Sequence, residues 1–83
     1  MDLKDEMSNR IKAAFDDAEV HLADYTGGGD HWEATIVSAA FEGMSRLQKH
    51  RSVYAALGEL MHGPIHALTF RTLTPEQYET ETS

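Results

Sequence analysis

Three consecutive glycines at positions 27 to 29 constrain the fold of this chain more than any other feature. On both sides of them, in the segments 20–25 and 32–39, apolar residues alternate with polar ones. Alternation with a period of two is typical of strands with one buried face, and a short glycine-rich connection between two such strands is typical of an antiparallel hairpin. We therefore predict a hairpin with a flexible loop at 26–30, which places His31 at the tip or at the first residue of the return strand.

The segment before the hairpin has the pattern of an amphipathic helix. Its apolar residues recur every three or four positions, which predicts a helix over residues 3–18. Asp2 is available as the N-cap, and Asp5 and Glu6 would lie beside the positive end of the helix dipole.

A longer helix is expected after the hairpin. Gly43 permits a sharp turn and Ser45 suits the N-cap position. The sequence leaves two alternatives open, one continuous helix or two helices with a break near residues 49–51. The helical segment should end at 62–64, because Gly63 suits a left-handed cap and the following proline cannot continue a helix. The expected apolar stripe consists of Leu47, Val53, Tyr54, Leu57, Leu60 and Met61, interrupted only by His50.

A third strand is predicted over residues 65–72, with His66, Leu68 and Phe70 on one face. The order helix, strand, strand, helix, strand indicates an α+β fold in which helices pack on one face of a three-stranded sheet. Because 83 residues can form only one small core, we expect a single domain over residues 1–83.

The end of the chain carries a further helix signal. Thr74 as N-cap and Pro75 at the first helical position predict a final turn that ends near Tyr78. A flexible acidic tail is expected at about 79–83.

Charge is distributed unevenly along the chain. The net charge of −7 disfavours non-specific binding to nucleic acid, yet three basic residues, Arg46, Lys49 and Arg51, fall within six positions. This basic patch would suit an acidic partner protein, a phosphate or glutathione. The alternative is a solvated helix face.

Several function classes are disfavoured by what the sequence lacks. Without cysteine the chain supplies no thiolate, so a soft-metal site would use histidine or be completed by another molecule.

No apolar run approaches the roughly 18 residues of a membrane helix, and the first residues are charged where a secretion signal is apolar. We expect a soluble, cytoplasmic protein. There is also no phosphate loop. The one pair of histidines at helical spacing, His62 and His66, is interrupted by Gly63-Pro64 and cannot share a helix, which argues against a zinc enzyme.

Several motifs between residues 19 and 78 resemble the BolA family, of the type with a histidine in the hairpin loop. They are the Phe41-x-Gly43 turn, Gln48-Lys49-His50-Arg51 leading to Val53-Tyr54, Ile65-His66-Ala67, and Leu73-Thr74-Pro75-Glu76-Gln77. The resemblance implies a fold similar to class II KH domains. It also implies a non-enzymatic partner of monothiol glutaredoxins that acts in iron-sulfur cluster trafficking or iron-linked regulation. Some family members form homodimers or are implicated in stress morphology and transcription.

The same resemblance implies the metal ligands. His66 matches the histidine at the start of the family's last strand, and His31 matches the hairpin loop, where the family has cysteine or histidine. These two imidazoles would hold a [2Fe-2S] cluster together with a glutaredoxin cysteine and glutathione, whereas the isolated chain would bind none. The basic patch Arg46, Lys49 and Arg51 is expected to face the partner or glutathione. The other histidines are interpreted structurally, with His50 solvated on its helix and His21 pointing outward from its strand.

A KH-like nucleic-acid-binding regulator is the alternative. KH domains hold the nucleic-acid backbone with a Gly-x-x-Gly loop. The corresponding turn here is Gly43-Met44-Ser45-Arg46, which lacks the second glycine. This departure weakens the case for the usual KH mode of RNA binding.

Overall fold

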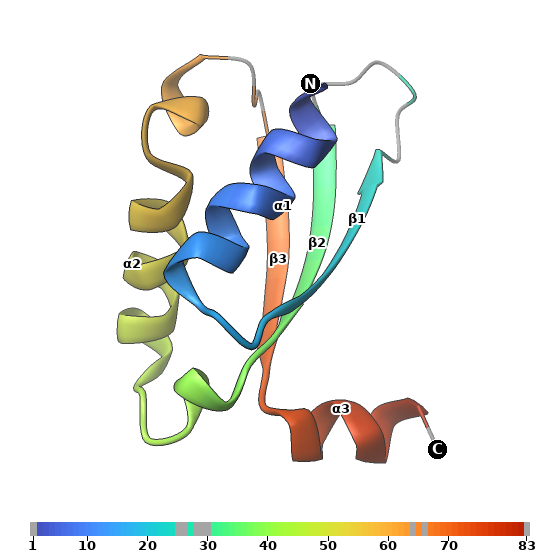
Figure 1. Ribbon diagram of the computed structural model, residues 1–83, viewed down its shortest axis with the longest axis vertical. Helices are drawn as coiled ribbons and strands as arrows, with labels where there is room; N and C mark the ends of the chain where they lie inside the picture. The colour runs from blue at the N-terminus through green and yellow to red at the C-terminus, as the bar shows by residue number, and fades with distance from the viewer. Residues whose placement is uncertain (1, 25–26, 28–30, 64, 66, 83) are drawn as a thin grey trace.

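The computed structural model describes residues 2–24, 27, 31–63, 65 and 67–82. They form a three-stranded sheet with helices before, between and after the strands (Figure 1). The central strand pairs antiparallel with the first strand and parallel with the third. The predicted α+β order is therefore confirmed. In chain order the elements are α1 (Leu3–Ala14), β1 (Glu19–Asp24), β2 (His31–Val37), the 3-10 helix η1 (Ala39–Phe41), α2 (Arg46–Leu57), the 3-10 helix η2 (Gly58–His62), β3 (Ala67–Leu73) and α3 (Pro75–Thr82).

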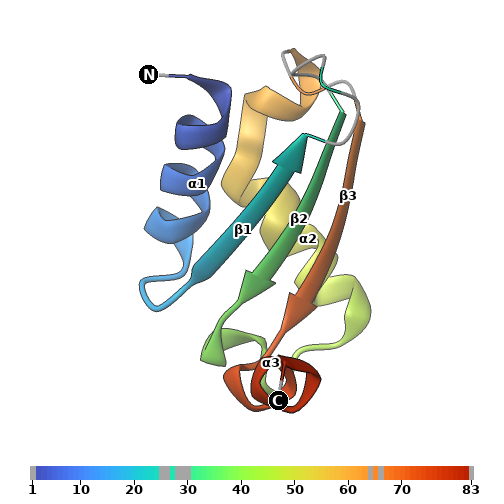
Figure 2. The ribbon, with the colours of Figure 1, turned by 90° about the vertical axis from the view of Figure 1, so that its right-hand side faces the viewer.

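The core lies between the sheet and the pair α1 and α2, which cover one face (Figure 2). Trp32, Ala34 and Ile36 alternate along β2 and are all buried against the helices, as the period of two predicts. The other members of the core cluster are Met7, Ile11, Phe15, Phe41, Val53, Leu57, Leu60 and Ile65.

The first helix is shorter than predicted. It ends at Ala14 rather than at residue 18, because Phe15 has left the helical conformation with φ −132° and ψ 96°. Two residues after Phe15, Asp17 accepts hydrogen bonds from the Ser38 hydroxyl at 2.5 Å and from the Ala39 amide at 2.8 Å. These contacts with a segment about 20 residues away fix the turn between α1 and β1.

The second helix is continuous, so the alternative with a break near residues 49–51 is wrong. Ser45 caps α2 as predicted, and its hydroxyl and the Gln48 side chain bond each other's backbone amides in a capping box. Leu47 is 56% exposed and does not belong to the core stripe. The physical reason is helical geometry: Leu47 precedes the buried Val53 by six positions and lies about 120° around the helix from it.

The boundaries of the last two elements also differ from the prediction. The third strand begins at Ala67 rather than at 65, although Ile65 is buried in the core. Leu68 and Phe70 pack against the core from the same face of β3. The predicted position of His66 on that face falls outside the described residues, as does most of the loop at 26–30.

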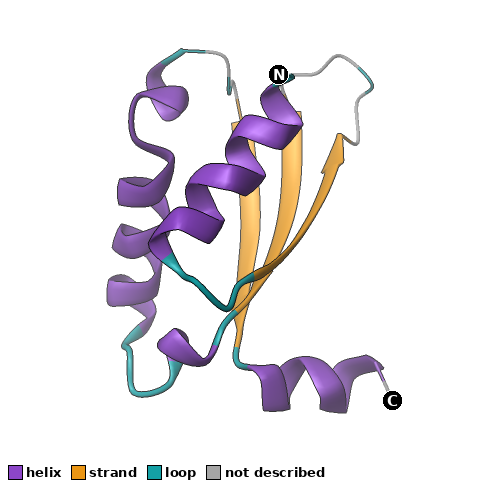
Figure 3. Ribbon diagram, viewed as in Figure 1, coloured by secondary structure: helices purple, strands orange, loops and turns teal. Residues whose placement is uncertain are grey.

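The last helix, α3, continues past Tyr78 to Thr82, so the segment after Tyr78 is helical where a tail was expected (Figure 3). The Tyr78 ring stacks on His21, with centroids 5.5 Å apart, and Glu81 forms an ion pair with Arg71. His21 lies between Val20 and Leu22, which pack against the core, so it points to the opposite sheet face. These contacts bring α3 to the face that α1 and α2 leave open.

None of the helices in the described ranges has the length and apolar character needed to cross a membrane.

Candidate functional site

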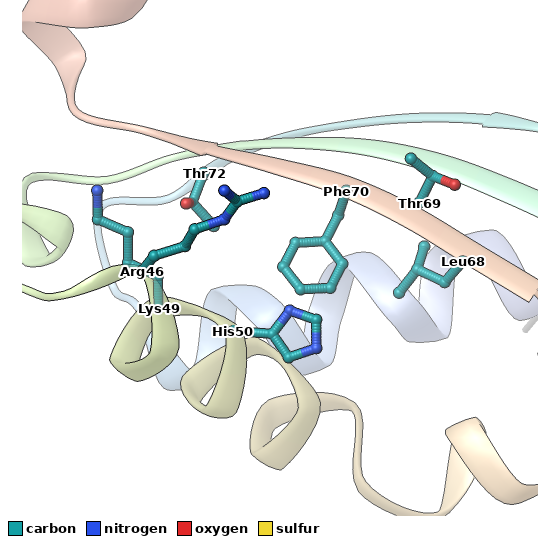
Figure 4. A pocket seen from close by; sticks show the side chains of 7 residues that line it. All are labelled: Arg46, Lys49, His50, Leu68, Thr69, Phe70 and Thr72. Carbon is teal, nitrogen blue, oxygen red and sulfur yellow. The ribbon is translucent and has the colours of Figure 1, made fainter.

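A pocket of about 300 Å³ lies between α2 and β3 (Figure 4). The helix contributes one wall through its first turns, and every second residue of the strand contributes much of the other. We call this site the α2–β3 groove. It is lined by Arg46, Lys49, His50, Leu68, Thr69, Phe70 and Thr72.

The groove is basic at the end near Thr72, where Figure 4 shows the Arg46 side chain. Arg46 is exposed and Lys49 is half-buried. Among the described residues, the arginine ion pairs are those of Arg10 and Arg71, and neither Arg46 nor Lys49 takes part in one. Two cations therefore lie at this end of the groove without an intramolecular carboxylate partner in the described part of the chain.

The middle of the groove is aromatic. The His50 ring lies 4.6 Å from the Tyr54 ring and 5.1 Å from the Phe70 ring, measured between centroids. Tyr54 and Phe70 are themselves 5.8 Å apart with an edge-on arrangement. His50 is exposed, as expected, but its ring also packs against Phe70, which is 20 residues away in the sequence. The contacts of His50 were not predicted from the sequence, although its spacing of four from Tyr54 on one helix was a signal for the contact between those two rings.

The predicted basic patch is only partly assembled. Arg46 and Lys49 line the groove, whereas Arg51 is exposed and does not line it. Arg51 follows Lys49 by two positions, which separates them by about 200° around the helix. The exposed Leu47 adjoins the groove instead, in a neighbouring hollow of about 360 Å³ that also includes Arg46 and His50.

The two predicted metal ligands can be followed only in part. His31 is the first residue of β2, is half-buried and pairs with Ala67 of β3. Because its neighbour Trp32 faces the core, the His31 side chain points to the opposite face of the sheet. His66 lies outside the described residues. No three histidine, cysteine, aspartate or glutamate residues within the described ranges are grouped so that they could hold a metal ion.

The sequence matches the model of one protein family, described as BolA-like protein, over residues 3–77. The chain belongs to the BolA family. It is 48% identical to human BolA-like protein 1 over 52 residues, which make up 63% of this chain and 38% of that protein. It is 34% identical over 64 residues to a Haemophilus influenzae protein named DNA-binding transcriptional regulator BolA, covering 76% of this chain and 62% of that one. The chain spans 38 to 39% of the length of the mammalian relatives that it matches.

Solved structures of BolA proteins share the fold. A BolA homologue from Coxiella burnetii has a TM-score of 0.77 at 36% identity, covering 95% of this chain and 99% of that one. A Bol-like protein from Babesia bovis has a TM-score of 0.83 at 31% identity, covering 100% and 96%. The predicted fold and the predicted family are both confirmed.

Proposed function

We propose that this chain is a non-enzymatic partner of monothiol glutaredoxins that helps to ligate a [2Fe-2S] cluster through His66 and His31. The supporting observation is the parallel register of β2 and β3, in which His31 pairs with Ala67. Ala67 is bonded directly to His66. The hairpin return and the start of the last strand therefore meet at one end of the sheet (Figure 2), although they are far apart in sequence.

The ligand chemistry supports a shared site. A [2Fe-2S] cluster takes four ligands, and this chain has no cysteine. Its two imidazoles would complement the thiolates of a glutaredoxin cysteine and of glutathione. Replacement of two thiolates on one iron by histidine raises the reduction potential, as in Rieske centres. A carrier or regulator of this kind needs no catalytic group of its own.

The test is visible circular dichroism of a [2Fe-2S]-loaded monothiol glutaredoxin titrated with this chain. We expect the spectrum to change on mixing, and His66→Ala to abolish the change. His31→Ala should reduce the spectral change. His62→Ala is the matched control, because His62 is an exposed histidine in η2, and it should leave the spectral change intact. An unaltered spectrum with the wild-type chain would refute the proposal.

Nucleic-acid binding is the second candidate, favoured by the cationic and aromatic α2–β3 groove and by the name of the Haemophilus influenzae relative. The net charge of −7 and the arginine at position 46, where KH loops have glycine, weigh against it. This second candidate is tested by measuring the affinity of the chain for short DNA and RNA at increasing salt concentration. Real phosphate contacts would give a slope of log affinity against log salt of about −0.7 to −0.9 per contact. If neither DNA nor RNA binds at low salt, nucleic-acid binding is excluded as a function.

A further inference from the structure

We propose that the α2–β3 groove binds an extended segment of a partner protein, which adds as a strand to the outer edge of β3 and places an acidic side chain against Arg46 and Lys49. This inference goes beyond cluster ligation and does not depend on it. It rests on the backbone direction of β3, on the residues that line the groove and on their charge.

The backbone of β3 presents hydrogen-bonding groups at its outer edge. Among the described residues β3 is an edge strand, because the strand order across the sheet is β1-β2-β3. The carbonyl of Leu73 points inward, since it accepts a hydrogen bond from the Ser38 amide at the end of β2. The amide and carbonyl of a strand residue point to the same side, and the side alternates at each residue. The backbone groups of Thr72, Phe70 and Leu68 therefore point outward, away from β2.

The same three residues form the wall of the groove. Leu68, Phe70 and Thr72 line it with their side chains, facing Arg46, Lys49 and His50 of α2 (Figure 4). A strand added to β3 would run about 4.8 Å from it and would point alternate side chains to the same face. Those side chains would enter the space between β3 and α2. Strand addition thus satisfies the outward backbone groups and fills the groove with one segment.

Charge determines which segment fits. The cations lie at the Thr72 end of the groove, and the aromatic and apolar residues Phe70 and Leu68 follow towards the other end. Residues on the same face of a strand are two positions apart. We infer that the bound segment carries aspartate or glutamate two positions from an apolar or aromatic residue.

A polypeptide fits this edge better than a nucleic acid does. The outward groups of Leu68, Phe70 and Thr72 include carbonyl oxygens as well as amides. A second strand provides both donors and acceptors along its backbone for such a row, whereas the phosphate backbone of a nucleic acid offers only acceptors, which carbonyl oxygens would repel, and leaves all donation to its bases. The net charge of −7 adds to this repulsion over the rest of the molecule.

The test uses fluorescein-labelled, blocked octapeptides of alternating valine and threonine. One carries Phe-x-Glu, one carries Glu-x-Phe, and each has a counterpart with lysine in place of glutamate. Fluorescence anisotropy is measured with the full chain in metal-free buffer. We expect at least one glutamate peptide to bind and its lysine counterpart to bind at least about tenfold more weakly. Equal affinity of the two, or no binding by any peptide, would overturn the proposal.

Backbone methylation tests the strand geometry. The binding peptide is made in two N-methylated forms, with methyl groups on the amides of alternate residues in one phase or in the other. Only one phase places its amides against β3, so we expect one form to lose binding and the other to retain it. Similar binding by both forms would exclude strand addition.

Protein variants test the charge contact. Arg46→Glu combined with Lys49→Glu should weaken binding of the glutamate peptide by at least about tenfold, whereas Arg51→Glu, a cation outside the groove on the same helix, should have little effect. Far-ultraviolet circular dichroism checks that each variant is folded. An octamer of thymidine is added as a competitor and should not displace the peptide. Displacement of the glutamate peptide by this oligonucleotide would assign the groove to nucleic acid and overturn the proposal.

Discussion

The carboxylate of Asp17 connects two distant turns of the chain. It accepts hydrogen bonds from the hydroxyl of the fully buried Ser38 and from the Ala39 amide. The hydrogen bond from Ser38, and then the one from Ala39, lowers the pKa of Asp17 below its ordinary value. Because these bonds stabilise the charged form, protonation of Asp17 opposes folding.

Asp17 should make the folding stability depend on pH in the acidic range. A pKa that is lower in the folded state gives a contribution to stability that is complete above the unfolded value of about 3.8 and is lost as the pH falls through the folded pKa. We expect Asp17→Asn to lower the urea midpoint at pH 7 and to differ less from the wild type at pH 3. Asp16→Asn is the control, because the carboxylate of Asp16 is adjacent in sequence but is not the one that accepts the hydrogen bonds from Ser38 and Ala39. An equal loss at both pH values would show that the Asp17 charge is irrelevant.

At the scale of elements, Arg10 links α1 to the junction of α2 and η2. Its guanidinium donates hydrogen bonds to the Leu57 carbonyl at 3.2 Å, to Glu59 at 3.2 Å and to Glu6 at 3.1 Å. The hydrogen bond to Glu59 is the main cause that raises the pKa of Arg10. The junction itself needs Gly58, whose φ of +54° is unfavourable for other residues. One planar side chain thus joins three segments that converge beside this glycine.

We expect Arg10→Lys to lower the thermal midpoint although it keeps the charge, because an ammonium group cannot reproduce the geometry of several bonds from one guanidinium. The measurement is a thermal melt followed by circular dichroism. Arg51→Lys, on the exposed side of α2, is the matched control and should melt with the wild type. If the two variants melt alike, the link between α1 and the junction does not contribute to stability.

The elements also show which features could be predicted from the sequence. The caps Asp2, Ser45 and Thr74 all form as predicted, because each depends on a residue three positions away. The early end of α1 and the full length of α3 were missed. They accompany contacts with distant segments, namely Asp17 with Ser38 and Tyr78 with His21. Local periodicity carries no information about such partners.

The residues of the candidate site also fall into those that could be predicted from the sequence and those that could not. Arg46 and Lys49 could be nominated from their spacing alone, and the structure brings both into the groove. Phe70 could not be nominated, because only the fold places β3 beside the first turns of α2. Arg51 does not line the groove, since proximity in sequence does not fix the side of a helix, and its contact with a partner stays a prediction.

At the scale of the whole molecule, the proposed metal ligand and the proposed peptide site lie apart. His31 pairs with Ala67 at the start of β3 and points to the sheet face away from α1 and α2. Arg46 lies near Thr72, on the helical face and five residues further along β3. At about 3.3 Å per residue, the two places are separated by about 17 Å along the strand. The molecule therefore has room for two contacts at once.

Sites at this separation should act independently, because mutations more than about 7 to 10 Å apart without shared partners are usually additive. We expect His31→Ala to weaken the spectral change with cluster-loaded glutaredoxin and to leave the affinity for the glutamate peptide unchanged. We expect the Arg46→Glu and Lys49→Glu pair to weaken the peptide affinity by the same factor whether or not His31 is present. The check is a double-mutant cycle in which peptide affinity is measured by anisotropy for all four proteins. A coupling beyond about 0.5 kcal/mol would mean that one binding event reaches both faces of the sheet, and the two surfaces would then have to be treated as a single site.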